Sequence, residues 1–80
     1  MYYTYQMRED CLRDEQGAEW IVYGLDAIDA QGHVLFSFAD IFFDRESAKN
    51  FVQICNEQKV ELLHIQEVVD DALVEQYLPI

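Results

Sequence analysis

The stretch "FSFADIFFDRESAKNFVQIC" (36–55) decides the fold, because its hydrophobic period changes in the middle. Before Asp44, apolar side chains recur with a period of two, which is typical of a strand. After Asp44, four apolar side chains follow the i, i+3, i+4, i+7 spacing of a helix with one buried stripe: Ala48, Phe51, Val52 and Cys55. Asp44 is a favourable N-cap residue, and Glu46 suits the positive end of the helix dipole. We therefore expect a strand over residues 33–42 and a helix over residues 45–57.

Two more strands are expected upstream. Residues 2–12 alternate between apolar and polar side chains, and residues 18–28 ("AEWIVYGLDAI") are apolar on both faces. A strand that is apolar on both faces usually lies in the centre of its sheet. The polar, glycine-ended segments 13–17 and 29–32 predict tight turns, so the three strands should form an antiparallel β-meander.

A second helix is expected from Ile65, where an apolar stripe faces away from a row of acidic side chains. The connection over residues 58–64 contains a short apolar piece, and whether residues 60–64 form a fourth strand stays open. The expected fold is a single small α+β domain over residues 1–80. It is a three-stranded antiparallel β-meander followed by two helices packed on one face of the sheet.

The charge balance excludes several functions. Sixteen acidic residues against five basic ones give a formal net charge of −11. Proteins that bind phosphate backbones use Lys and Arg, so we expect no direct nucleic-acid binding, and no binding to an anionic membrane surface. Partners that this charge permits are basic proteins, apolar surfaces, cations or further copies of the chain.

The N-terminal "MYYTYQMRED" lacks the basic and apolar regions of a secretory signal, and no apolar stretch is long enough to span a bilayer. We therefore expect a cytoplasmic protein whose two cysteines, Cys11 and Cys55, are free thiols. A Cys11–Cys55 disulfide is the alternative.

The stretch "ICNEQKVELLHI" (54–65) brings together a Cys, an Asn and a His, the residue types of some thiol-protease sites. Cys55, however, falls in the last turn of the expected helix, where the dipole disfavours a thiolate. We expect Cys55 to be a buried structural thiol, Asn56 to belong to the helix cap, and His64 to be partly buried at the start of the second helix. No catalytic residue is predicted, and we expect a protein that is not an enzyme.

A zinc site would need ligands from Cys11, His33, Cys55 and His64. Their separations along the chain are 22, 22 and 9 residues, without the close ligand pairs that zinc sites commonly use. We therefore predict no metal site and no cofactor.

Four short motifs carry a resemblance over residues 20–75: "VYG", "DI-x2-DRESA", "F-V-x-I-CN" and "LLHI-x-EVVDD". In these motifs the chain resembles short proteins of clostridia-like Gram-positive bacteria that form a domain of unknown function. The resemblance implies a compact fold in a cytoplasmic bacterial protein. It implies no activity, substrate or catalytic residue.

Two helices can cover only one face of a sheet whose strands are apolar on both faces, so some apolar side chains should face outward. The candidates for an interaction surface are Tyr3, Tyr5, Trp20, Val22, Leu35 and Ile41. The first and third strands are also free edges. We therefore predict a small, acidic, non-enzymatic protein-interaction module, with regulation as one candidate role, that acts through its apolar sheet face or an edge strand. Its partner would be a second copy, as a homodimer, or an unidentified protein.

Two alternatives differ in class. The high negative charge would also suit an acidic mimic of nucleic acid that inhibits a basic protein. The third hypothesis is a thiol-dependent enzyme or redox protein that uses Cys55 and His64.

Overall fold

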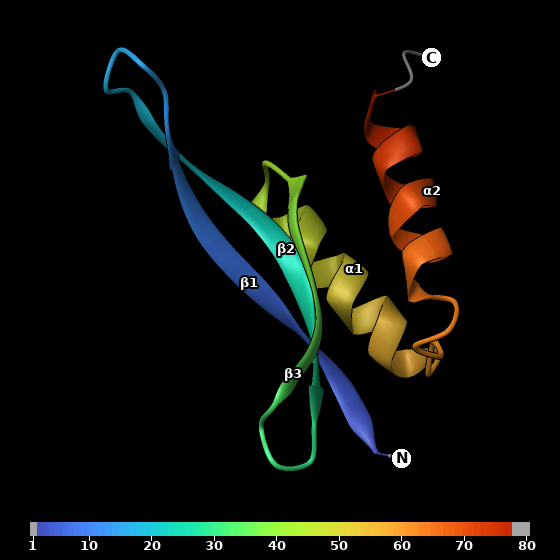
Figure 1. The fold of residues 1–80 in the computed structure, drawn as a ribbon. Coiled ribbons are helices and arrows are strands. Elements are labelled where there is room, and N and C mark those ends of the chain that lie inside the picture. The colour runs from blue at the N-terminus through green and yellow to red at the C-terminus, as the bar shows by residue number, and fades with distance from the viewer. Residues whose placement is uncertain (1, 78–80) are drawn as a thin grey trace.

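A computed structural model describes residues 2–77 and confirms the expected α+β architecture (Figure 1). An antiparallel sheet of order β1-β2-β3 is followed by two helices that contact it. The elements are β1 (Tyr3–Arg13), β2 (Glu19–Asp29), β3 (Val34–Phe42), α1 (Arg45–Glu57) and α2 (Ile65–Tyr77). The central position of β2 and the start of both helices agree with the sequence analysis. Residues 60–64 form turns and no fourth strand.

The two hairpin turns share one design, which follows from the repeated pattern Asp-x-Gln-Gly. Asp14 accepts the N–H groups of the residues two and four positions later through Oδ1, both at 2.9 Å, and Asp29 does the same. In each turn the glycine, Gly17 or Gly32, takes a positive φ of 86° or 87°. These carboxylates replace water as partners of the turn amides, and glycine adopts the left-handed conformation without steric cost.

The two strand pairings differ in regularity. β1 and β2 pair without interruption from Tyr3 opposite Asp29 to Arg13 opposite Glu19. β3 pairs only with residues 23–28 of β2, and its register shifts twice. The larger shift contains Asp40, which has a positive φ of 60°.

Gly24 of β2 lies at the larger register shift between β2 and β3. A Cβ atom at this position would lie 2.0 Å from the carbonyl oxygen of Phe38, so only glycine permits the backbone of β3 to approach so closely. The backbone of β3 therefore covers part of the face of β2 that points away from the core.

The hydrophobic core lies between the other face of the sheet and the helices. α1 contacts all three strands and α2 contacts β3. The fully buried side chains of this core come from every element: Tyr5, Leu25, Ala27, Ile41, Phe42, Ala48, Cys55, Ile65 and Val69. The expected apolar stripes of both helices are confirmed, and the acidic side chains of α2 are exposed. Within residues 2–77, no helix is long and apolar enough to cross a bilayer.

The local sequence explains how α1 begins. Asp44 has an extended backbone, and its Oδ2 accepts the N–H of Ser47 at 2.9 Å and the Ser47 hydroxyl at 2.8 Å. These bonds satisfy one of the free amides at the helix start and lower the pKa of the Asp44 carboxyl.

At the other end of α1, Lys59 takes a positive φ of 51° just beyond the last helical residue.

Three residues expected to face outward are buried. Tyr5, Val22 and Ile41 have exposed fractions of 3%, 0% and 2%. Ile41 lies in the core because the register shifts of β3 change the face on which its side chain falls. Val22 lies on the same face of β2 as Gly24 and is buried apart from the core cluster between the sheet and the helices. The Tyr5 ring points into the core and its hydroxyl reaches the connection after α1.

Candidate functional site

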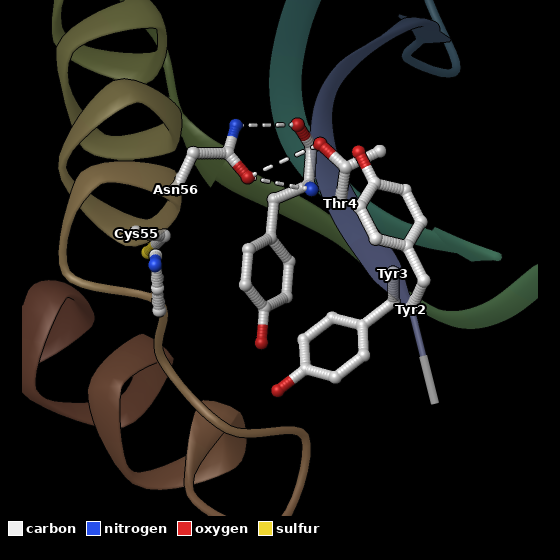
Figure 2. A pocket seen from close by; sticks show the side chains of 7 residues that line it. Tyr2, Tyr3, Thr4, Cys55 and Asn56 are labelled. Atoms are coloured by element: carbon white, nitrogen blue, oxygen red, sulfur yellow. Dashed lines mark hydrogen bonds between the residues drawn. The ribbon is translucent and has the colours of Figure 1, made fainter. Parts of the chain in front are cut away.

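Asn56 joins the end of α1 to the outer edge of β1 (Figure 2). Its Oδ1 accepts the backbone N–H of Tyr5 at 2.8 Å, and its Nδ2 donates to the Tyr5 carbonyl at 2.9 Å. The Thr4 hydroxyl donates to the same Oδ1 at 3.3 Å. A carboxamide presents one donor and one acceptor side by side, so Asn56 satisfies Tyr5 as a neighbouring strand would.

Two tyrosines reinforce this contact on the core side. The hydroxyl groups of Tyr3 and Tyr5 both donate to the carbonyl of Val60, at 3.2 and 2.5 Å. Burial, together with the neighbouring Tyr3 hydroxyl, raises the pKa of Tyr5 to about 12. A cavity of about 530 Å³ opens beside these groups, and it is lined by Tyr2, Tyr3, Thr4, Tyr5, Cys55, Asn56 and Lys59.

The contact with Asn56 shows which way the backbone groups of β1 point. The N–H and C=O of Tyr5 point away from β2, toward α1. In a regular antiparallel strand, alternate residues direct their backbone groups to the same side. Because the pairing of β1 with β2 is unbroken, the backbone groups of Met7, Glu9, Cys11 and Arg13 also point outward.

Beyond Tyr5 this edge is unpaired. Within the described residues 2–77, no strand or side chain bonds to the outward N–H and C=O groups of residues 7–13 of β1, which we call the open edge. Unpaired backbone groups in an extended strand are a template for another strand. The outer edge of β3 is a poor template by comparison, because its two register shifts distort the spacing of its backbone groups.

The open edge lies on a two-stranded extension of the sheet. β3 pairs with β2 only from Tyr23 onward, so residues 10–22 form a hairpin without a third strand, which we call the arm. In Figure 1 the blue and teal strands of the arm diverge from both helices and end in a turn at the upper left. Two-stranded ribbons are marginally stable in water.

Apolar side chains remain exposed on both faces of the arm. Trp20 lies opposite Leu12 and is 40% exposed, whereas Ile21 lies opposite Cys11 and is 47% exposed. Trp20 and Ile21 therefore leave apolar surface exposed to solvent on both faces of the arm.

Charges on the arm are mostly paired. The Arg8 guanidinium binds both carboxylate oxygens of Asp10 at 2.8 Å and approaches Asp26 at 3.4 Å. These bonds lower the pKa of the Asp10 carboxyl. Arg13 forms an ion pair with Glu19 across the hairpin. Among the described residues, no ion pair or hydrogen bond reaches the Glu9 carboxylate on the open edge.

The structure does not gather the expected surface residues into one patch. Tyr3 lies opposite Asp29 at one end of the sheet, and Trp20 lies near the other end. Tyr3 and Leu35 are half-buried against the core, and only Trp20 of the six is substantially exposed. Other large apolar side chains are exposed instead: Tyr2, Ile21, Val34, Phe36, Phe43, Ile54, Leu63 and Val74.

The residues of "ICNEQKVELLHI" serve separate structural roles. Both cysteines are free, and Cys55 is buried as expected, with a pKa raised by burial to about 11. Asn56 is not a left-handed cap residue, because Lys59 takes that conformation and Asn56 binds β1. His64 is exposed, which contradicts the expected partial burial, and its Nδ1 lies 3.8 Å from Glu67.

The arrangement of Cys55 offers little nucleophilic chemistry, since a protonated thiol is a weak nucleophile. Among residues 2–77 no group of three or more His, Cys, Asp or Glu side chains is arranged to hold a metal ion.

Comparison with known proteins finds no matching family model, curated protein or solved structure. The resemblance to short proteins of clostridia-like bacteria therefore stays a prediction.

Proposed function

We propose that the chain is a protein-interaction module that binds another polypeptide by adding it as a strand to the open edge of β1. One observation carries this proposal. The outward backbone groups of Glu9, Cys11 and Arg13 are unpaired on a strand whose register with β2 is unbroken, while those of Tyr5 on the same strand are already bonded to Asn56.

Strand addition matches the physical properties of the arm. An added strand would satisfy free backbone groups, and each hydrogen bond contributes about 0.5–1.5 kcal/mol net. It would also turn a marginal two-stranded ribbon into a sheet of three strands or more. The gain in the stability of the arm would add to the affinity.

The acidic-mimic alternative receives less support, because many carboxylates have local structural partners. Asp14, Asp29 and Asp44 accept backbone amides in turns and at a helix start. Asp10 and Asp26 bind Arg8. Carboxylates held in such pairs are poorly placed to imitate a row of free phosphates.

A proline on the open edge tests the proposal. The Cys11 N–H points outward, so Cys11→Pro removes a donor from the open edge without removing a bond to β2. Cys11→Ser keeps the donor and is the matched control. We expect wild type and Cys11→Ser to recover the same bound chains in an affinity experiment from native lysate, and Cys11→Pro to lose them.

Circular dichroism of both variants checks that they fold. Recovery of the same chains by folded Cys11→Pro would contradict strand addition at this edge.

A further inference from the structure

We infer that the strand added to the open edge is the β1 strand of a second copy, antiparallel to the first, with a two-fold axis at Cys11. This inference rests on the proposed function and names its partner. The result would be a continuous six-stranded sheet in which the two arms lie side by side.

Backbone geometry limits the possible registers. Outward-pointing residues of one copy must face outward-pointing residues of the other, because only those backbone groups are free to bond across the new junction. Symmetric pairing can therefore centre only on one residue of the strand. Centring on Met7 or Arg8 would need the backbone groups of Tyr5, which Asn56 already binds, and centring on Arg13 would oppose Arg13 to its own copy. The remaining centres on the open edge are Glu9, Asp10, Cys11 and Leu12.

Three of these registers oppose like charges. Centring on Glu9 places Glu9 against its own copy, and it also brings Arg13 of the second copy to Tyr5, whose backbone groups Asn56 already binds. Centring on Asp10 places Asp10 against its own copy. Centring on Leu12 places Asp10 opposite Asp14 of the second copy. Like charges directly opposite each other destabilise a strand pair.

The register centred on Cys11 has complementary charges instead. It places Glu9 opposite Arg13 of the second copy, and the symmetry repeats this pair. Glu9 is the carboxylate of the open edge that has no partner within residues 2–77 of the single chain. Asp10 would face Leu12 of the second copy, which is tolerable because both Asp10 oxygens already accept bonds from Arg8.

This register would form about six new backbone hydrogen bonds, because Glu9, Cys11 and Arg13 each offer one donor and one acceptor. The arm regions would become a four-stranded sheet of order β2-β1-β1-β2, which removes the open edge from both copies. Each chain carries a net charge of −11, so long-range repulsion opposes the pairing at low salt. Salt of about 0.15 M screens that repulsion beyond about 8 Å, whereas contacts across the junction are screened less.

Charge reversal tests the register. Sedimentation equilibrium at about 0.15 M salt should show a concentration-dependent dimer for wild type. Glu9→Arg turns both complementary pairs into repulsive pairs and should weaken the dimer by about tenfold or more. Glu61→Arg makes the same change in net charge at an exposed residue of the connection and should leave the dimer constant within about twofold.

The combination Glu9→Arg, Arg13→Glu and Glu19→Arg reverses both Glu9–Arg13 pairs of the junction and preserves the hairpin ion pair with opposite sign. It should restore the dimer to within about threefold of wild type. Equal dimer constants for wild type and folded Glu9→Arg, or no restoration by the folded triple variant, would overturn the register centred on Cys11.

Thiol crosslinking gives a second readout. Directly opposed residues of this kind have Cα atoms about 5.5 Å apart, which suits a disulfide. Diamide accepts two electrons and two protons while the Cys11 thiols of two copies join through a new S–S bond. Wild type should crosslink about tenfold faster than Glu9→Arg, which keeps the same exposed thiol. Equal rates would contradict opposed Cys11 residues.

These results separate the inference from the proposed function. A purified chain that stays monomeric up to high micromolar concentration overturns self-pairing. If Cys11→Pro then still abolishes capture of other chains, strand addition at the open edge stands with a different partner. If Cys11→Pro also captures the same chains as Cys11→Ser, the proposed function fails as well.

Discussion

Asn56 shows how one side chain can determine which part of an edge strand stays available. Its carboxamide occupies the backbone groups of Tyr5 and leaves those of Glu9 and Cys11 free. This role could not be predicted from sequence, because Asn56 and Tyr5 are 51 residues apart and meet only when α1 packs on the sheet. An Asn near a helix end favours the cap interpretation when no tertiary contact is known.

Asn56→Ala should lower the free energy of unfolding by about 1–3 kcal/mol, because it leaves the Tyr5 amide and carbonyl without their partners. Asn50→Ala is the matched control on the same helix, at an exposed position. We expect it to change stability by less than about 0.5 kcal/mol. Urea denaturation measures both, and equal midpoints for the two variants would contradict the role of Asn56.

Gly24→Ala should destabilise the fold by about 3 kcal/mol or more, because the new Cβ would overlap the carbonyl oxygen of Phe38. Gly17→Ala provides the comparison, since its Cβ would meet no atom within 4 Å and only the positive φ is unfavourable. We expect about 1–2 kcal/mol for Gly17→Ala. Thermal melting of both variants shows which substitution destabilises the fold more. A smaller loss for Gly24→Ala than for Gly17→Ala would contradict the close approach of the Phe38 carbonyl to Gly24.

The helices and hairpins follow closely from the local hydrophobic period and the turn residues of the sequence. The change of period at Asp44 predicted the helix over 45–57, and α1 occupies Arg45–Glu57. The glycine-ended turns predicted both hairpins. The faces of β3 could not be predicted, because alternation assumes a regular strand and the register shifts around Asp40 place Ile41 in the core. The predicted outward positions of Tyr5, Val22 and Ile41 are thus wrong, whereas the predicted edge strands, β1 and β3, are confirmed.

At the start of α1, Asp44→Ala should lower the melting temperature at neutral pH by several degrees, because it removes the bonds to Ser47. The folded state lowers the pKa of Asp44, so this stabilisation is present above the unfolded value of 3.8 and is lost as the pH falls below it. Melting curves of wild type and Asp44→Ala should therefore converge toward about pH 3. A difference that is unchanged at about pH 3 would contradict this account.

For the whole molecule, burial of the Tyr5 hydroxyl and the Cys55 thiol predicts that the folded state becomes less stable at high pH. The pKa of Cys55 rises from 9.0 to about 11, and that of Tyr5 rises from 10.0 to about 12. Since the folded state retains these protons to higher pH than the unfolded state, the contribution of these two groups to stability should be constant below about pH 9 and decrease as the pH rises toward 12. Urea midpoints at about pH 8 and about pH 10.5 measure the decrease.

Cys55→Ala is the control for this pH dependence, because it removes one of the two titrating groups. Its urea midpoint should be lower at about pH 8, owing to lost packing, but should fall less on going to about pH 10.5. An identical pH dependence in wild type and Cys55→Ala would exclude the thiol as a cause.

The overall shape combines a packed half with an extended half. Both helices contact the half of the sheet that contains β3, and the arm points away from them with exposed apolar side chains and a free backbone edge. A folding unit that maximised only its own stability would gain by shortening this arm, since a two-stranded ribbon contributes little. The arm and its open edge are therefore the part of the molecule best suited to contact another chain.

Amide hydrogen exchange at Tyr5 and Cys11 tests this central claim most directly, because both N–H groups point outward from the same strand. In dilute protein, Tyr5 should be protected by Asn56 and Cys11 should exchange freely. At high concentration, strand addition should protect the amides of Glu9, Cys11 and Arg13 and leave Tyr5 unchanged. Free exchange at Cys11 at every concentration, and in the presence of the chains that Cys11→Ser recovers from lysate, would contradict strand addition to the open edge.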